Sequence, residues 1–162
     1  MEAERKGEEV KLVEPYVNLL HATPKMVEVI EQAGRLCYKS ERKEGDTPER
    51  FVNRIMKLGH ESVIEHATVG VIIGTDRGVT HELVRHRIAS YSQTSTRYCN
   101  YAKDSFGGEL SFVVPSGLKT PEMFKAWRVS CEVAEDAYLD LIRKGATPQI
   151  ARSVLPNSLF TE

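Results

Sequence analysis

Residues 85–97, RHRIASYSQTSTR, combine cationic side chains with a run of small hydroxyl and amide side chains. Arg85, His86 and Arg87 follow a pattern typical of a helix end, where the helix dipole favours positive charge. The segment before Arg97 offers many hydrogen-bonding groups, and Arg97 closes it with a planar fork that suits phosphate. The stretch therefore predicts a local anion site for a polar ligand, and an exposed loop of solvated cations is the alternative.

A second polar cluster, GHESVIEH, occupies residues 59–66. Its two histidines and two glutamates could ligate a metal ion. His60 and His66 are six residues apart, however, instead of the three or four that place two ligands on one helical face. We therefore expect no metal here and favour a polar corner that hydrogen-bonds a ligand or a neighbouring subunit.

A third segment, ARSVLP, spans residues 151–156 and places one arginine in an apolar context. A buried Arg152 would need an anionic partner, whereas the alternative is an arginine that extends its head group to solvent. Ser95 has the chemistry of a nucleophile, but no base stands beside it in the sequence to activate its hydroxyl. We therefore expect Ser95 to bind a ligand.

Bulk properties exclude several classes of protein. The 162 residues carry a formal net charge of -1, so overall electrostatics favour neither DNA nor an anionic membrane as partner. Cys37, Cys99 and Cys131 are widely spaced and lack metal-ligand spacing, which indicates a reducing compartment without a disulfide framework. The N-terminus is charged where a signal peptide is apolar, and no apolar run is long enough to span a membrane. We expect a cytoplasmic protein.

The elements that must position these residues are predicted from capping signals and periodicity. Four threonine–proline pairs resemble helix starts, in which threonine is the N-cap and proline the first helical residue; the threonines are Thr23, Thr47, Thr120 and Thr147. Apolar residues recur at helical spacing after each pair, most extensively from Phe124 to Leu141, a stripe that we interpret as core.

Strands are fewer than helices. Runs of β-branched and other apolar residues predict strands at 10–13, 17–20, 67–73 and 111–114, and residues 102–109 are predicted to form a loop. The pattern indicates a mixed α/β (α+β) fold in one domain, in which helical residues outnumber strand residues.

Taken together and in this order, the three polar segments resemble the flavin-dependent thymidylate synthases, known as ThyX. The triplet that starts at Arg85, followed after seven further residues by Ser95, matches the family signature. Residues 59–66 resemble the family's GHE(S/T)xxEH-like segment, and residues 151–156 resemble its ARxVLP segment.

The resemblance implies a ThyX-type fold with helices flanking a central, mainly antiparallel sheet, in a single domain over residues 1–162. It implies conversion of dUMP to dTMP, with methylenetetrahydrofolate as carbon donor, FAD as redox cofactor and NADPH as reductant. It also implies a cytoplasmic homotetramer with active sites between subunits, and no nucleic acid or membrane as partner. Because the family passes the methylene through reduced flavin, no enzyme cysteine is needed as nucleophile.

The resemblance also carries roles to single residues. The positions that it places at FAD are His60, Ser62, Glu65, Arg85, His86, Arg87 and Gln93. The positions that it places at dUMP are Glu82, Arg85, Gln93, Thr94, Ser95, Thr96, Arg97 and Arg152. Arg97 and Arg152 would hold the phosphate, and no residue is assigned as catalytic. Glu82 stands where the family often has glutamine, and its carboxylate accepts a hydrogen bond but donates one only when protonated.

This sequence departs from the family pattern at its end. Family members continue beyond the ARxVLP segment with further FAD contacts and an arginine that polarises the uracil ring, whereas this sequence ends at Glu162. We therefore expect a C-terminally truncated ThyX-like chain. Two alternatives remain open: a non-catalytic nucleotide- or flavin-binding fragment, which would bind flavin without forming dTMP, and a nucleic-acid-binding module, whose DNA binding would depend steeply on salt.

Overall fold

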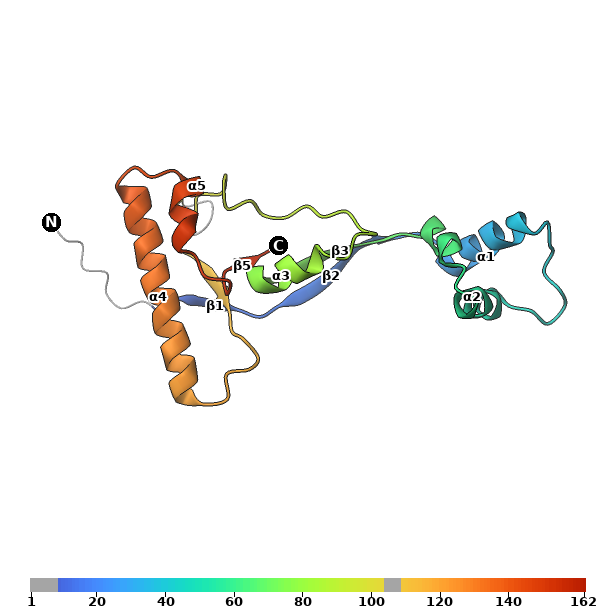
Figure 1. The fold of residues 1–162 in the computed structure, drawn as a ribbon, viewed down its shortest axis with the longest axis horizontal. Helices are drawn as coiled ribbons and strands as arrows, with labels where there is room; N and C mark the ends of the chain where they lie inside the picture. The colour runs from blue at the N-terminus through green and yellow to red at the C-terminus, as the bar shows by residue number, and fades with distance from the viewer. Residues whose placement is uncertain (1–8, 104–108) are drawn as a thin grey trace. The chain divides into compact units, whose positions relative to one another are not determined.

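The computed structural model describes residues 9–103 and 109–162, which form two compact units (Figure 1). The second unit is Val17–Ile72, and the first unit contains the rest of the chain. Most of the predicted loop at 102–109 lies outside the described residues. The elements in chain order are β1 Lys11–Val13, β2 Tyr16–Ala22, α1 Met26–Cys37, α2 Pro48–Lys57, the 3-10 helix η1 Glu61–His66, β3 Val69–Asp76, α3 Arg77–Leu83, β4 Ser111–Val113, α4 Pro121–Arg143, α5 Pro148–Ala151, the 3-10 helix η3 Arg152–Val154 and β5 Phe160–Thr161.

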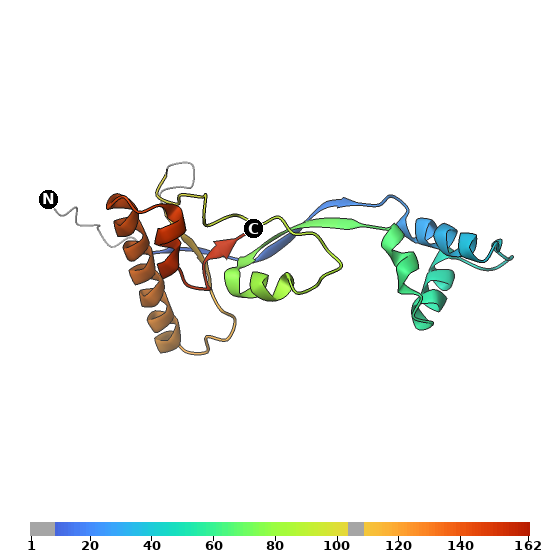
Figure 2. The ribbon, with the colours of Figure 1, turned by 45° about the horizontal axis from the view of Figure 1, so that its top comes forward.

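Two small sheets connect distant parts of the sequence. One sheet has the strand order β2-β3-β5, and β3 pairs antiparallel with β5, with Thr75 opposite Thr161 (Figure 2). The other sheet pairs β1 in parallel with β4, with Leu12 opposite Phe112. The antiparallel sheet and the flanking helices confirm the predicted mixed fold class. Each of the four predicted strands is present, with ends shifted by a few residues.

The core of the first unit forms around α4. Its buried apolar residues are Val10, Tyr101, Leu110, Phe112, Cys131, Tyr138, Ala151 and Leu159. The stripe predicted on α4 is therefore core at Cys131 and Tyr138, and Trp127 packs against the same cluster. The buried carboxylate of Glu135 accepts a 2.8 Å hydrogen bond from the Leu110 amide, which satisfies a buried donor. No helix within the described ranges is both long enough and apolar enough to cross a bilayer.

The second unit packs α1 against α2 around a smaller core of Ile30, Phe51 and Ile55. The two helices approach closely at Gly34. A Cβ atom at this position would lie 2.6 Å from a ring carbon of Phe51, which is too close for any non-bonded contact. Glycine is therefore required for this helix pair to pack as it does.

The predicted threonine caps have mixed outcomes. Thr47 and Thr120 accept hydrogen bonds from the amides three residues ahead, at 3.3 and 3.2 Å, so both helix starts are confirmed. Thr147 precedes α5 but makes no side-chain capping bond. The prediction at Thr23 is wrong, because the N-cap of α1 is Lys25 in a left-handed conformation. The Thr23 hydroxyl instead accepts a 2.9 Å hydrogen bond from the Thr68 amide, a tertiary contact that competes with capping.

The two threonines of the first unit offer a matched test of capping. Thr120→Ala should lower the free energy of unfolding by about 1 kcal/mol, because the amide of Met123 loses its partner. Thr147→Ala should cost less than about 0.5 kcal/mol, since its side chain makes no capping bond. Urea unfolding followed by circular dichroism measures both, and equal losses in the two variants would contradict the capping assignment.

Candidate functional site

The short helix α3 places the cationic triplet directly after its last turn. Asp76 fixes the start of this helix, because its carboxylate accepts a 2.8 Å hydrogen bond from the Val79 amide. The chain turns after the helix, where the Arg85 amide donates to the Glu82 carbonyl at 3.0 Å. The helix ends at Leu83, so the triplet lies in the turn that follows and not on the helix.

The triplet is presented to solvent. Arg85, His86 and Arg87 are exposed, and within the described residues their side chains make no hydrogen bond or ion pair. The Tyr91 hydroxyl lies 2.9 Å from the carbonyl oxygens of both Leu83 and His86, and so holds the turn against the helix end. Sequence reasoning missed Tyr91, although a single large aromatic ring inside a run of small polar residues was a usable signal.

The segment after the triplet is tied to α3 and to β5. The Gln93 amide nitrogen donates to the hydroxyls of Thr80 and Thr161, at 3.0 and 3.2 Å. The Thr94 amide donates to the Glu162 carbonyl at 2.8 Å. These bonds fix the backbone of the predicted nucleotide-binding stretch, although the stretch has no regular secondary structure of its own.

Arg152 meets this stretch from the far end of the sequence. Its Nη1 atom donates a 3.3 Å hydrogen bond to the Thr96 hydroxyl, across 56 residues of chain. Thr96 is buried and Arg152 is partly buried, so the guanidinium is neither a fully buried charge nor a freely extended one. Among the described residues this is the one partner found for a side chain with five N–H donors, which leaves most of the fork for a ligand.

Ser95 and Arg97 flank Thr96 and serve local structure. The Arg97 amide donates to the Ser95 hydroxyl at 3.3 Å, and the Arg97 guanidinium carbon lies 5.6 Å from the centroid of the Tyr98 ring. Within the part of the chain that the structure describes, no histidine or carboxylate bonds to the Ser95 hydroxyl. Glu82 is exposed on α3, and its carboxylate likewise contacts no described cation. Among the described residues Ser95 therefore has no activating base, and its role in ligand binding stays a prediction.

The remaining predicted residues belong to the second unit. His60 is the N-cap of η1, and Ser62 and Glu65 lie on this short 3-10 helix with their side chains exposed. Across residues 9–103 and 109–162, no group of three histidine, cysteine or acidic side chains could hold a metal ion. The structure thus gathers the residues from Glu82 to Arg97 with Arg152 in the first unit, and the three η1-associated residues in the second.

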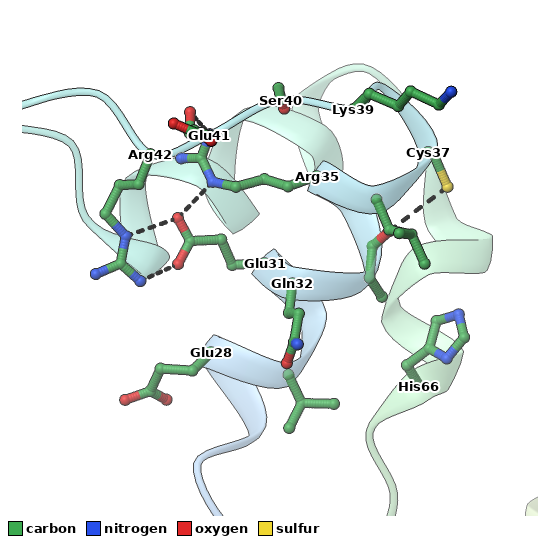
Figure 3. A pocket seen from close by; sticks show the side chains of 13 residues that line it. Glu28, Glu31, Gln32, Arg35, Cys37, Lys39, Ser40, Glu41, Arg42 and His66 are labelled. Carbon is green, nitrogen blue, oxygen red and sulfur yellow. Dashed lines mark hydrogen bonds and ion pairs between the residues drawn. The ribbon is translucent and has the colours of Figure 1, made fainter.

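The second unit also contains an open pocket of about 1030 Å³ beside α1 (Figure 3). Its lining combines both charge signs with apolar side chains; the residues are Glu28, Val29, Glu31, Gln32, Ala33, Arg35, Leu36, Cys37, Lys39, Ser40, Glu41, Arg42 and His66. His66, the last residue of η1, is the part of the GHESVIEH cluster that reaches this pocket.

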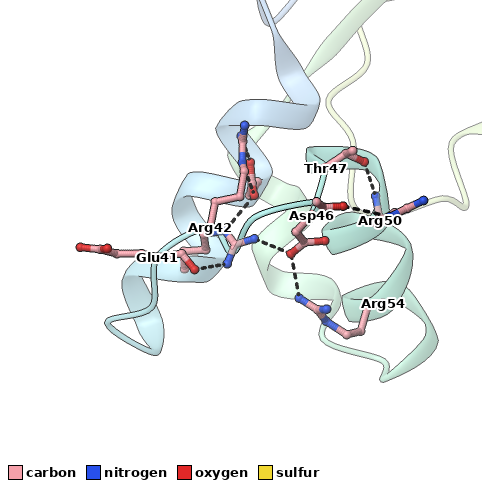
Figure 4. Close-up of polar contacts among 9 residues, drawn as sticks. Glu41, Arg42, Asp46, Thr47, Arg50 and Arg54 are labelled. Carbon is pink, nitrogen blue, oxygen red and sulfur yellow. Dashed lines mark hydrogen bonds and ion pairs between the residues drawn. The ribbon is translucent and has the colours of Figure 1, made fainter.

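Arginine–carboxylate pairs hold the wall of this pocket together. Buried Glu31 bonds to the guanidinium groups of both Arg42 and Arg35, the latter at 2.8 Å. Arg35 also reaches Asp46 at 2.8 Å, and Arg54 approaches the same carboxylate at 3.8 Å (Figure 4). Hydrogen bonds from Arg42 and then Arg35 hold the pKa of Glu31 below its usual value, and the bond from Arg35 does the same to the pKa of Asp46.

Residues 18–162 match the family described as thymidylate synthase complementing protein, Thy1. This chain belongs to the Thy1 family. It is 39% identical over 155 residues to a flavin-dependent thymidylate synthase of Geobacter sulfurreducens, which covers 90% of this chain and 65% of that protein. A flavin-dependent thymidylate synthase of Pyrococcus furiosus is 35% identical over 155 residues, which cover 90% of this chain and 63% of that protein. The chain therefore spans a little less than two thirds of the length of these curated relatives.

Two solved structures share the fold of this chain. The UMP/dUMP methylase PolB from Streptomyces cacaoi, bound with 5-Br UMP, superimposes with a TM-score of 0.76 at 21% sequence identity. The match covers 94% of this chain and 71% of the other. A second structure of PolB, bound with 5-Br dUMP, gives a TM-score of 0.75. The mixed helix and sheet architecture of this chain is thus the fold of PolB.

The cysteines of this Thy1 chain differ in their surroundings. Burial raises the pKa of the Cys131 thiol to about 11, so this side chain stays protonated and unreactive at neutral pH. Cys37 is exposed on α1 and Cys99 is partly buried. The buried position of Cys131 agrees with the prediction that the apolar stripe from Phe124 to Leu141 packs in the core.

The Glu31 network predicts a specific dependence of stability on pH. Because the pKa of Glu31 is lower in the folded protein than its ordinary 4.5, its contribution is fully present above that value and is lost as pH falls through the folded pKa. Glu31→Gln should cost about 2 kcal/mol at pH 7, less than for a fully buried pair because Arg42 is half-exposed. In Glu31→Gln, the fall in the free energy of unfolding that protonation of Glu31 causes at low pH should also be absent.

Urea unfolding at pH 7 and at a series of values below 4.5 measures both effects. Glu28→Gln on the same helix is the matched control, since Glu28 is exposed, and it should change stability by less than about 0.5 kcal/mol. An acid dependence that is identical in the wild type and in Glu31→Gln would contradict the lowered pKa.

Proposed function

We propose that this chain is part of a flavin-dependent thymidylate synthase that methylates dUMP to dTMP. The observation that carries the proposal is the hydrogen bond between Arg152 and Thr96, because it joins two of the three segments that resemble ThyX. Family membership supports the reaction class, and so do the names of the relatives, which are flavin-dependent thymidylate synthases. The structural neighbour PolB is a UMP/dUMP methylase, which points to the same nucleotide substrate.

The nucleotide is assigned to the first unit. Arg152 and Arg97 take the phosphate of dUMP, because a guanidinium fork forms paired, charge-assisted hydrogen bonds with phosphate oxygens. The remaining polar residues then serve the sugar and the base; they are Glu82, Arg85, Gln93, Thr94, Ser95 and Thr96. Ser95 acts here as a hydrogen-bonding group and not as a nucleophile. Catalysis consists of positioning the reacting groups and stabilising charge, without a covalent bond to the enzyme.

The flavin is assigned to the triplet and to η1. Two exposed arginines and a histidine without a partner among the described residues fit the diphosphate of FAD, and this is the observation that supports the assignment. The full set of FAD residues is Arg85, His86, Arg87, Gln93, His60, Ser62 and Glu65. FAD, when bound, supplies the redox chemistry that turns a transferred methylene group into a methyl group.

Further properties of the enzyme follow from the resemblance alone. Methylenetetrahydrofolate is proposed as the carbon donor and NADPH as the reductant. The working form is proposed to be a cytoplasmic homotetramer whose active sites lie between subunits, and each chain is proposed to be one ThyX-like domain over residues 1–162.

Arg152 gives the sharpest test of the phosphate assignment. Arg152→Ala should weaken dUMP binding at least tenfold, because a charge-assisted hydrogen bond is worth roughly 1.5–3 kcal/mol. Thr96→Val should weaken it less, by mispositioning the guanidinium, and Thr96→Ser should restore it. Isothermal titration calorimetry measures the dissociation constants for dUMP. The control is Arg143→Ala, which removes an exposed arginine on α4. Unchanged dUMP binding in Arg152→Ala would mean that the phosphate lies elsewhere.

Flavin retention tests the triplet. After incubation with FAD and gel filtration, the wild-type chain should keep a visible flavin absorption band that shifts when dUMP is added. Arg85→Ala should keep markedly less flavin than Arg143→Ala, because it removes one of the two arginines assigned to the diphosphate. A colourless wild-type protein would contradict flavin binding by this chain.

Product formation separates the enzyme from a binding fragment. The flavin-loaded chain is supplied with dUMP, methylenetetrahydrofolate and NADPH, and dTMP is measured by chromatography. Formation of dTMP supports the synthase, whereas retained flavin without dTMP favours the non-catalytic fragment. Tight binding to DNA that falls steeply with salt would favour the nucleic-acid module instead.

A further inference from the structure

One exposed face of α2 carries a row of positive charge. Arg50, Arg54 and Lys57 follow one another at intervals of four and three residues, so their side chains lie along the same face of the helix. Together with Asn53 and Leu58 they line an open groove of about 410 Å³, which we call the cationic groove.

The helix dipole explains only part of this row. Arg54 and Lys57 lie in the last turn of α2, where the partial negative charge of a helix C-terminus favours cations. Arg50 lies in the first turn, three residues after the N-cap Thr47, where the dipole disfavours a cation. Helix stability alone therefore does not account for the row.

Contacts within the chain use little of this charge. The Arg54 Nη2 atom lies 3.8 Å from a carboxylate oxygen of Asp46, which another arginine already engages at 2.8 Å (Figure 4). The Arg54 side chain is 56% exposed, and a long, exposed ion pair of this kind contributes little. Arg50 donates one 2.9 Å hydrogen bond to the Gly45 carbonyl, and no described residue pairs with the Lys57 ammonium. Most donors in the groove are therefore available to an anionic ligand.

The spacing of the cations fits several separate negative charges and not one compact anion. At a rise of about 1.5 Å per residue, the three side chains are spread over about 10 Å of the helix axis. A single phosphate is bound by donors that converge on it. No aromatic ring lines the groove, so a nucleic acid base has no surface on which to stack. A flexible chain of carboxylates matches the row best.

One end of the groove is joined to the segment assigned to flavin. The His60 amide donates to the Ile55 carbonyl, and the Gly59 amide donates to the Met56 carbonyl, both at 3.0 Å. These bonds hold the last turn of α2 against the N-cap of η1, within the second unit. Leu58 of the groove is thus two residues from His60, and the groove leads away from η1 along α2.

We propose that the cationic groove binds the glutamate tail of the folate substrate. Because the methylene group passes to the flavin, the ring that carries it lies at the flavin, and the tail leaves along α2 from Lys57 toward Arg50. Folates end in a glutamate that is extended by further γ-linked glutamates, and each added residue brings one carboxylate for a charge-assisted hydrogen bond. This tail site rests on the proposed function, because the folate is the carbon donor only there.

The unmodified chain gives the first test. Isothermal titration calorimetry, with FAD present, compares folic acid with its pentaglutamate form. The pentaglutamate should bind at least tenfold more tightly, and this ratio should shrink as sodium chloride is added, because salt screens exposed charges. Equal dissociation constants, or no binding of either form, would overturn the tail site, whereas flavin retention, dUMP binding and dTMP formation test the proposed function separately. An oligo(dA) strand that displaces the pentaglutamate in the presence of saturating dUMP would overturn it too.

Arg50→Gln tests the groove itself, since Arg50 lies at the end away from η1. The variant should weaken pentaglutamate binding at least threefold and leave folic acid binding unchanged, because a single glutamate ends before Arg50. Arg143→Gln, the same change at an exposed arginine of α4, should alter neither constant. An equal loss for both ligands would mean that Arg50 acts through the fold, and an unchanged pentaglutamate constant would mean that the tail lies elsewhere. Either result would overturn the proposal.

Discussion

The segment from Asn157 to Glu162 is the constraint on which the site of the first unit depends. The carbonyl of Leu159 accepts the Arg77 amide at 3.1 Å, the carbonyl of Ser158 accepts the Val113 amide at 2.9 Å, and the carbonyl of Glu162 accepts the Thr94 amide at 2.8 Å. One short stretch thus bonds to α3, to β4 and to the loop that follows the cationic triplet.

Burial gives this segment its fixed position. Leu159 is completely buried in the core around α4, and a leucine of this kind stabilises the fold by about 2 kcal/mol through the hydrophobic effect. The neighbouring Ser158 hydroxyl accepts a 2.9 Å hydrogen bond from the Trp127 indole. Because Arg152 is only a few residues earlier in the chain, anchoring this segment also limits where its guanidinium can lie, which is against Thr96.

The two units use arginine in different ways. In the second unit, Arg35 and Arg42 are bound to Glu31, and Arg35 is bound to Asp46 as well, so these guanidinium groups serve the structure of the pocket wall. In the first unit, Arg85 and Arg87 extend into solvent without a partner among the described residues. A chain with a net charge of -1 can therefore concentrate unpaired positive charge at one place, where an anionic ligand supplies the missing counter-charge.

The sequence by itself determined the features that depend on residues close together in the chain, such as helix caps and motifs. Thr47 and Thr120 cap helices because capping joins residues three apart, and the motif around Arg85 together with its two flanking segments indicated the family. Only the tertiary structure decided the contacts between distant residues. Thr23 bonds to Thr68 instead of capping a helix, and Arg152 bonds to Thr96 across 56 residues. Such pairs form because the sheets and the core bring distant segments together. The spacing of residues along the sequence does not show which distant residues will be in contact.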